Sequence, residues 1–363
     1  MEYKIAVFPG DGVGPELINE GIKVIEKIAE LDKFNIEWAR YELLSENTLK
    51  DIKNSCNAIY CGTFDNAAND AKQKISNHIK DYFDQFVSLR PIKLLPNIES
   101  PLAGKTHNDI NFVVIRENTE DFYIGAGGRV KNGKNKHQID INKGVCKVKF
   151  ALNIEVKGNE VAYQIGVLSK KGCDRVIEYA FEYAKRKNKK RVVAVDKANV
   201  LDSYNFWRES VDKIAKDYPE LNYEFSLIDT TVMNFIRQPE KYEIIVAPNM
   251  FGDILGDLGT ILQGGLSLAA QGNINPEGIS MFEPIHGSAP KLKEQGIVNP
   301  IAVIWAGALM LDSIGQHKSG DLIIKAIESV LKDGRIRTQD LNGNNTTSEM
   351  GDAIVDKLIE IHD

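Results

Sequence analysis

The stretch EIIVAPNMFGDILGDL, residues 243–258, joins an apolar run typical of a buried strand to a segment with the residue spacing of a helix. The apolar run ends at Pro248, and Gly252 opens the helical segment. On a helix, Asp253 and Asp257 would lie on one face, one turn apart. The end of a strand is where α/β proteins bind their ligands, and hard divalent cations prefer oxygen ligands. The stretch therefore indicates an α/β fold with a candidate cation site, whereas a solvated helix face is the alternative.

The same alternation of apolar runs and helical stretches recurs along the chain. The strand-like runs are YKIAVF (3–8), FNIEWARY (34–41), RVVAVD (191–196), YEFSLID (223–229) and YEIIVAP (242–248). This order predicts an α/β protein with a mostly parallel sheet. Residues 136–168 instead alternate polar and apolar side chains, which predicts antiparallel strands or an extended arm; an arm would serve as an interface, and an edge hairpin would cover its own sheet. TTSE (346–349) is a capping box that predicts a final helix.

Composition excludes several classes of protein. The chain has 363 residues, enough for two domains, with 43% hydrophobic and 26% charged residues. A formal net charge of -6 gives no reason to expect nucleic-acid binding. The four cysteines form no CxxC pair and the six histidines are scattered, so neither a zinc site nor a disulfide framework is predicted. No signal peptide or membrane span is recognised, and we expect a cytoplasmic protein.

Several charged or ionisable residues stand at the ends of strand-like runs. Arg90 and Arg116 each end such a run, and two guanidinium groups at one site could grip carboxylates bidentately. Tyr123 follows, and a tyrosine beside cations can donate a proton. Lys197 comes just after a strand, where a lysine held among cations can act as a base. Asp229 is a third carboxylate at a strand end.

Two loops complete the set of candidate segments. PGDGVGPE (9–16) is a glycine-rich turn between a strand and a helix, but Pro15 stands where a dinucleotide fingerprint needs close approach of the helix. We interpret it as a tight loop that could line a cofactor, and not as a phosphate cradle. MFEPIHGSAPK (281–291) is a loop of small residues with one histidine, which could pack on a flat ligand.

Taken in order, these stretches resemble the β-decarboxylating dehydrogenases, the family of isocitrate, homoisocitrate, 3-isopropylmalate and tartrate or D-malate dehydrogenases. The resemblance runs through GDGVGPE, LRP, RENTEDFY, DKANV, NMFGDILGDL, FEPIHGSAP and TTSE, from near the start to near the end. It implies a two-domain, non-Rossmann isocitrate/isopropylmalate dehydrogenase-like fold with a β-rich dimerisation arm. We place one domain at residues 1–90 and 262–363, and the second at 91–261.

The resemblance also implies a metal and a dimer. Mg2+ or Mn2+ would be held by Asp253 and Asp257 of one chain with Asp229 of the partner subunit. Lys197, also from the partner subunit, would take part in removing the hydroxyl proton. The active site would therefore be shared between the two chains of a homodimer.

Three further residues receive roles from the resemblance. Tyr123 would give a proton to the enolate carbon, and Arg90 and Arg116 would hold the carboxylate that leaves as CO2. Because Tyr123, Lys197 and the three aspartates are all present, we expect a catalyst and not a non-catalytic regulatory subunit of the same fold or a binding module without turnover.

The cofactor implied is NAD or NADP. The residues expected to bind it are Glu283, His286, Gly287, Ser288, Ala289, Lys291 and Asn299. Relatives that prefer NAD have an aspartate after HGSAP, and Lys291 reverses that charge. The sequence therefore favours NADP, although the Tyr and Arg that hold the 2'-phosphate in some NADP-linked relatives are not evident in TQDLNGNN.

The substrate is expected to be a malate-type acid whose second carbon carries a variable group. Most relatives have an arginine at the position of Lys80, which can hold a carboxylate as a point charge but not as a fork. Lys72, Ser76 and Asn77 add polar groups where an isopropyl group would leave them unpaired. We therefore expect isocitrate or homoisocitrate first, and tartrate, D-malate or 3-isopropylmalate as alternatives.

Overall fold

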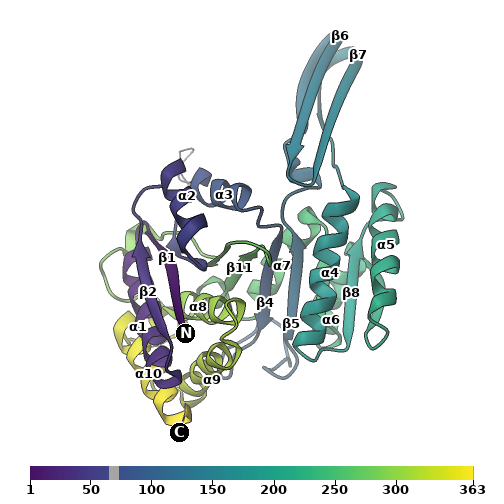
Figure 1. The fold of residues 1–363 in the computed structure, drawn as a ribbon. Coiled ribbons are helices and arrows are strands. Elements are labelled where there is room, and N and C mark those ends of the chain that lie inside the picture. The colour runs from purple at the N-terminus through teal and green to yellow at the C-terminus, as the bar shows by residue number, and fades with distance from the viewer. Residues whose placement is uncertain (65–72, 363) are drawn as a thin grey trace. The chain divides into compact units, whose positions relative to one another are not determined.

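The chain forms two compact units, each described here by itself (Figure 1). The computed structural model describes residues 1–64 and 73–362, without the side chains of residues 73–75. Unit 1 comprises Met1–Val113 and Gly256–Asp363, and unit 2 comprises Val114–Leu255. The first and last parts of the chain thus build one unit, and the middle builds the other.

The boundaries differ from the sequence-based ones at 90/91 and 261/262 for identifiable reasons. Strand β4 (Val87–Lys93) pairs with β11 (Ala270–Ile274), which keeps the residues after 90 in unit 1. The amide of Leu94 also donates to the carbonyl of Ile110 (3.0 Å). Helix α7 (Asn249–Leu262) passes from unit 2 into unit 1, so its second half joins the unit where β4 lies.

Unit 1 is an α/β layer structure. Its elements are β1 (Glu2–Gly10), α1 (Gly14–Asp32), β2 (Asn35–Arg40), α2 (Glu46–Ser55), β3 (Ala58–Thr63), α3 (Gln73–Tyr82), β4, η4 (Leu266–Leu268), β11, β12 (Ser280–Pro284), η5 (Pro290–Leu292), α8 (Ile301–Ser313), α9 (His317–Asp333), η6 (Gln339–Leu341) and α10 (Thr347–His362). The strand order is β2-β1-β3-β12-β11-β4. β1, β2, β3 and β12 are parallel, whereas β11 runs antiparallel to both β12 and β4.

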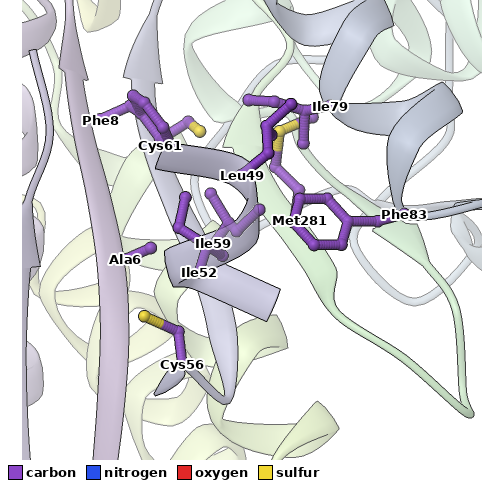
Figure 2. Close-up of a cluster of buried hydrophobic side chains, with 10 residues drawn as sticks. All are labelled: Ala6, Phe8, Leu49, Ile52, Cys56, Ile59, Cys61, Ile79, Phe83 and Met281. Atoms are coloured by element: carbon purple, nitrogen blue, oxygen red, sulfur yellow. The ribbon is translucent and has the colours of Figure 1, made fainter. Parts of the chain in front are cut away.

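Alternation along the central strands sends side chains to both faces of the unit 1 sheet. On one face, a cluster of buried residues joins β1, β3 and β12 to helices α2 and α3, as Figure 2 shows. On the other face, the Tyr60 hydroxyl donates to the Val303 carbonyl of α8 (2.7 Å). Helix α8 is apolar and buried on nearly all sides, so it forms the centre of that layer. Both faces are covered, as expected for parallel strands.

Unit 2 contains four further strands of β-sheet and the hairpin of β6 and β7. Its elements are β5 (Asn111–Glu117), which crosses the unit boundary, η1 (Phe122–Ile124), β6 (Gly127–Lys143), β7 (Cys146–Gln164), α4 (Lys170–Arg186), β8 (Arg191–Asp196), α5 (Ser203–Ile214), η2 (Ala215–Asp217), β9 (Asn222–Leu227), α6 (Ile228–Arg237), η3 (Pro239–Lys241), β10 (Ile244–Ala247) and the start of α7. The strand order is β5-β10-β8-β9, and β8 is parallel to β9 and β10. The predicted strand–helix alternation is confirmed here.

The predicted antiparallel arm is the hairpin β6–β7, which pairs from its base to its tip with one interruption and is folded back on itself. The register shifts beside Gly133, and Gly133 and Gly158 have φ of 106° and 136°, a region that side chains rarely adopt. His137 pairs with Leu152 in the ladder, yet its Nδ1 lies 2.8 Å from the hydroxyl of Tyr163 near the base. The fold in the hairpin explains this contact between distant ladder positions.

The structure also describes the four cysteines and the TTSE stretch. All four cysteines carry free thiols. The TTSE capping box is formed: the Thr346 amide donates to Glu349 (2.7 Å), and the Glu349 amide donates to Thr346 Oγ1 (3.2 Å). Within residues 1–64 and 73–362, no helix combines the length and apolar character needed to cross a membrane.

Candidate active site

Helix α7 carries Asp253 and Asp257, four residues apart, as the opening stretch predicted. Their neighbours Phe251 and Leu255 are buried, which fixes the rotation of the helix. Another face of α7 carries Gly252 and Gly256, which have no side chains. A Cβ added at Gly252 would lie 2.6 Å from Cβ of Arg116, and one at Gly256 would lie 2.6 Å from Nη1 of Arg90. The glycines therefore let one arginine of each unit lie flat against α7.

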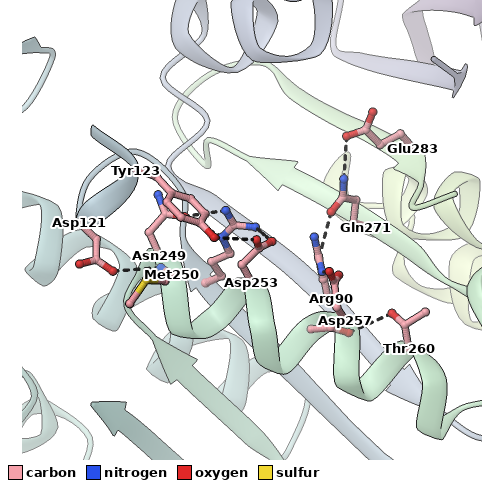
Figure 3. A network of polar contacts seen from close by, with 12 residues as sticks. Arg90, Asp121, Tyr123, Asn249, Met250, Asp253, Asp257, Thr260, Gln271 and Glu283 are labelled. Carbon is pink, nitrogen blue, oxygen red and sulfur yellow. Dashed lines mark hydrogen bonds and ion pairs between the residues drawn. The ribbon is translucent and has the colours of Figure 1, made fainter. Parts of the chain in front are cut away.

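In unit 2, Arg116 contacts Asn249, Asp253 and Tyr123, and Figure 3 shows these three side chains side by side. Its Nε and Nη2 both donate to Oδ1 of Asn249 (2.9 and 2.7 Å), and its Nη1 forms an ion pair with Asp253. The Tyr123 ring lies 5.5 Å from the guanidinium carbon, and the Tyr123 hydroxyl donates to Asp253 (3.1 Å). Burial and the Asp253 charge raise the pKa of Tyr123, so the hydroxyl keeps its proton at neutral pH.

The turn that presents Tyr123 is anchored by Asp121. This residue has φ 64°, outside the usual range for a side chain, and it is buried. Its carboxylate accepts from the Tyr204 hydroxyl (2.9 Å) and from the Met250 amide in the first turn of α7 (3.0 Å). The strained backbone is therefore compensated by hydrogen bonds that tie the tyrosine to the start of the aspartate helix.

In unit 1, Arg90 has a comparable setting. Its Nη1 forms an ion pair with Asp257 (2.6 Å), and its Nε donates to Oε1 of Gln271 (3.1 Å). Arg90 is 6% exposed, whereas the side chain of Asp257 is 67% exposed. A guanidinium fixed from one side in this way keeps a defined orientation toward an incoming carboxylate.

Lys197 and Asp229, which the sequence separates by 32 residues, form an ion pair in unit 2. Lys197 follows β8, and Asp229 lies in the first turn of α6 just after β9, so the parallel pairing of these strands brings them together. The Lys197 ammonium lowers the pKa of Asp229. The side chain of Asp229 is 60% exposed, and the pair faces solvent in the single chain.

A buried carboxyl, Glu117, lies beside Arg116 in the sequence and forms no ion pair with the residues that the structure describes. Burial raises its pKa to about 7, although it accepts hydrogen bonds from the amide and hydroxyl of Thr119 and from the Glu120 amide. The folded protein therefore holds this proton more tightly than the unfolded chain does.

The raised pKa of Glu117 predicts how the free energy of unfolding depends on pH. Because the folded pKa is raised, the stability contribution is present at low pH and is lost as pH rises from about 4.5 to about 7. The loss should be of the order of 3 kcal/mol. Calorimetric unfolding of Glu117→Gln should show a weaker fall between pH 5 and pH 8 than the unsubstituted protein. A Glu349→Gln control should not flatten the curve, since the hydrogen bonds of Thr346 lower the pKa of Glu349 and its effect has the opposite sign. Parallel curves for Glu117→Gln and the unsubstituted protein would contradict the assignment.

The two candidate loops of unit 1 are joined to each other. The Val13 amide donates to the Ser288 carbonyl (2.9 Å), and a Cβ on Gly12, which has φ 58°, would lie 2.0 Å from that oxygen. Gly12 is therefore needed for the close approach. Ser288 is buried, and Ala289 has φ 39°.

His286 has one ring nitrogen engaged and one available. Its Nδ1 lies 3.1 Å from the carbonyl of Gly287, which assigns the proton to Nδ1. Its Nε2 is buried without a hydrogen-bond partner among residues 1–64 and 73–362. Burial lowers the pKa of His286, so the ring is neutral and Nε2 presents a lone pair. Such an atom suits a ligand N–H donor, for example the amino group of adenine.

The remaining predicted cofactor residues lie in different settings. Glu283 ends β12 in a buried position, and Lys291 is exposed in η5. Asn299 is buried, donates to Asp340 (3.1 Å) and accepts from the Ile301 amide at the start of α8 (3.0 Å). The side chain of Asn299 therefore has an internal role in holding the α8 terminus.

The expected substrate residues of α3 are described only in part. Lys72 lies outside the described residues. Ser76 and Lys80 are half-buried and Asn77 is exposed. The next residue, His78, lines a cavity of about 920 Å³ together with Asp11 and Phe64 at the carboxyl ends of β1 and β3. His78 of α3 thus borders this cavity, whereas Ser76, Asn77 and Lys80 are not among its lining residues.

Three residues that contact these side chains are not indicated by the sequence motifs. Asn249 and Asp121 lie inside stretches that were recognised, but only their contacts reveal that they hold Arg116 and the Tyr123 turn. Gln271 had no recognisable signal, because a polar residue in a strand is ordinarily a solvent-facing one.

Comparison with known proteins shows the class of protein to which this fold belongs. The family described as isocitrate/isopropylmalate dehydrogenase matches residues 4–354. The chain is 37% identical to the D-malate dehydrogenase [decarboxylating] of Escherichia coli (97% of each chain) and 34% identical to the tartrate dehydrogenase/decarboxylase of Pseudomonas putida (99% and 98%). The crystal structure of isocitrate dehydrogenase from Methylococcus capsulatus matches with a TM-score of 0.81 and 31% identity, over 98% of this chain and 99% of that one.

The chain belongs to the isocitrate/isopropylmalate dehydrogenase family. It is a decarboxylating dehydrogenase that acts on the CH–OH group of a hydroxy acid. The resemblance, the fold and the reaction class expected from the sequence are thereby confirmed. Members of the family use NAD or NADP and a divalent metal.

Proposed function

We propose that the protein oxidises and decarboxylates a malate-type acid whose second carbon carries hydrogen or a small polar group, as in D-malate or tartrate. The observation that carries the proposal is the pairing of each aspartate of α7 with an arginine, Asp253 with Arg116 and Asp257 with Arg90. Each pair offers a carboxylate to a cation and a guanidinium to a substrate carboxylate. Both pairs are neutral, so binding a divalent cation with a dicarboxylate leaves the charge unchanged.

The donor set fits a hard divalent ion such as Mg2+ or Mn2+. Asp253 and Asp257 supply carboxylate oxygens from one helix. The described residues of a single chain contain no group of three His, Cys, Asp or Glu side chains that could hold a metal. As the family resemblance implies, the proposal takes the third ligand, Asp229, from a partner subunit. When bound, the ion would polarise the hydroxyl and the adjoining carboxylate of the substrate.

The chain's own residues would then handle the protons. Tyr123 keeps its hydroxyl proton and lies against Arg116, so it can donate to the carbon that loses CO2. Arg116 and Arg90 would orient the departing carboxylate. Lys197 would take part in removing the hydroxyl proton from a substrate bound to the partner subunit. The exposed Lys197–Asp229 pair suits such a role, because both side chains are accessible to a second chain.

The loop from Glu283 to Lys291 fits a nicotinamide dinucleotide. The lone pair of His286 Nε2 has no hydrogen-bond partner in the part of the chain that the structure describes, and the hydrogen bond from the Val13 amide to the Ser288 carbonyl joins the two loops. The cofactor would accept the hydride of the substrate. Exposed Lys291 favours NADP over NAD by attraction to a 2'-phosphate. We place Gly287, Ala289 and Asn299 in the same region.

The choice among acids rests on two observations. The relatives with 37% and 34% identity act on D-malate and tartrate by name. Ser76 and Asn77 of α3 are polar, and burying an isopropyl group against them would leave polar groups unpaired at roughly 1 to 3 kcal/mol each. Isocitrate or homoisocitrate is the second candidate, because Lys80 offers positive charge and the isocitrate dehydrogenase structure matches over the whole chain. 3-Isopropylmalate stands behind both.

We further propose a cytoplasmic homodimer. The folded β6–β7 arm exposes many side chains along both strands, which suits pairing with the arm of a second copy. The free thiols agree with a reducing compartment.

A panel assay tests the substrate. The purified protein with Mn2+ is assayed against D-malate, tartrate, isocitrate, homoisocitrate and 3-isopropylmalate, with NAD and with NADP. We expect kcat/KM for D-malate or tartrate to exceed that for 3-isopropylmalate by about tenfold or more. The highest kcat/KM for 3-isopropylmalate would contradict the interpretation of α3. The highest kcat/KM for isocitrate or homoisocitrate would favour the second candidate. Absence of turnover with every acid would overturn the proposed function. A strong preference for NAD would show that Lys291 does not contact the cofactor phosphate.

A further inference from the structure

Three residues on adjacent strands of unit 1 form a continuous polar row. Gln271 of β11 pairs directly with Glu283 of β12, and its neighbour Gly272 pairs with Leu89 of β4, beside Arg90. Side chains opposite one another on neighbouring strands lie in contact distance. The row therefore runs Arg90, Gln271, Glu283, with the glutamine between a guanidinium and a carboxylate (Figure 3).

The amide of Gln271 has a unique orientation in this row. Its Oε1 accepts from Arg90 Nε (3.1 Å), and its Nε2 donates to Glu283 Oε1 (2.8 Å). The reversed amide would direct N–H groups at the guanidinium and an oxygen at the carboxylate, which both partners disfavour. Arg90 and Glu283 are each 6% exposed, so little water is available to replace either bond. Glu283 also accepts from Asn273 (2.9 Å), which fixes the far end of the row.

We propose that Gln271 is a positioning residue that couples the substrate arginine to the cofactor loop. The inference rests on the proposed function, in which Arg90 binds the substrate carboxylate and Glu283 lies at the start of the cofactor loop. A substrate carboxylate that binds Arg90 moves the guanidinium and so alters its hydrogen bond to Oε1 of Gln271. The side-chain amide of Gln271 then shifts, which alters the hydrogen bond from its Nε2 to Glu283. Coupling of this kind is reciprocal, so the cofactor also affects affinity for the acid.

Two variants separate this role from simple support of the fold. Gln271→Leu removes both hydrogen bonds at similar volume. Gln271→Glu keeps the length but adds a negative charge that binds Arg90 and repels Glu283, and it has no N–H for Glu283. Thr260→Val is the matched control, since it removes a buried hydroxyl that donates to the Gly256 carbonyl of its own helix (2.9 Å).

The experiment measures binding and not turnover. The dissociation constant of NADPH is determined by fluorescence with Mn2+, with and without saturating D-malate or whichever acid the panel identifies. We expect the acid to change this constant by about fivefold or more in the unsubstituted protein and in Thr260→Val, and by less than about twofold in Gln271→Leu and Gln271→Glu. Gln271→Glu should also raise the KM for the acid more than Gln271→Leu does.

The outcomes separate the two proposals. An unsubstituted protein that turns over no acid contradicts the proposed function. A protein that turns over an acid but shows no effect of the acid on NADPH binding overturns the coupling, and so do variants that retain the full effect. If calorimetry shows that Gln271→Leu does not fold, Gln271→Glu decides the question through the same ratio of NADPH dissociation constants with and without the acid.

Discussion

Substituting Asp253 by asparagine is expected to lower kcat/KM by roughly a thousandfold, because the neutral amide forfeits about 4 kcal/mol of attraction to a divalent cation. The substitution keeps the size of the side chain. Its Oδ1 can still accept from Arg116, so the surroundings of α7 should persist. A calorimetric titration with Mn2+ should show clearly weaker binding, and chelator should abolish turnover of the unsubstituted enzyme until Mg2+ or Mn2+ is restored.

Asp333→Asn is the matched control for this substitution. Asp333 also forms an ion pair with an arginine, Arg335, and its side chain is 33% exposed, close to the 29% of Asp253. Its replacement should leave kcat/KM and the Mn2+ titration unchanged. An Asp253→Asn protein with undiminished metal dependence, or an enzyme that resists chelator, would remove Asp253 from the metal site.

The second large effect is expected from Tyr123 and Lys197, which we assign to different steps. Tyr123→Phe should lower overall turnover by about a hundredfold or more, since the donor for the final proton is lost. It should leave reduction of the added 2-oxo acid intermediate partly intact. That reduction is the reverse of hydride transfer, which precedes decarboxylation in the forward direction. Lys197→Met should depress both oxidation of the hydroxy acid and reduction of the 2-oxo acid. The measurement is the pair of rates for each variant.

Surface pairs of the same chemistry serve as controls. Tyr223 donates to Asp212 (2.8 Å) as Tyr123 donates to Asp253, and Lys213 pairs with Asp174 (3.0 Å) as Lys197 pairs with Asp229. Tyr223→Phe and Lys213→Met should leave both rates near those of the unsubstituted enzyme. If Tyr123→Phe and Lys197→Met lost both rates equally, the division of labour between them would be wrong.

Local sequence signals predicted a large part of the fold. The apolar run before Pro248 became β10, the spacing of Asp253 and Asp257 became one face of α7, and TTSE became the capping box of α10. Each of these depends on neighbours within one or two turns, where hydrogen-bonding rules and side-chain period act directly. The alternating pattern from residue 136 likewise predicted antiparallel strands, although the fold in the hairpin at Gly133 and Gly158 gave no recognisable signal.

Contacts between distant segments were decided only by tertiary structure. The sequence supplied Arg116, Asp253 and Tyr123 as separate candidates, but their closed cluster depends on glycines of α7 that admit the arginine. The ion pair of Lys197 with Asp229 depends on parallel pairing of β8 with β9.

The polar row through Gln271 shows most clearly what the sequence alone could not predict. By itself, the sequence determined which side chains were available and which face of each element they occupy, because those properties follow from local periodicity. It could not determine that Gln271 lies between Arg90 and Glu283, since that depends on the antiparallel insertion of β11 between β4 and β12. Strand order is set by the packing free energy of the whole unit, which no short stretch contains.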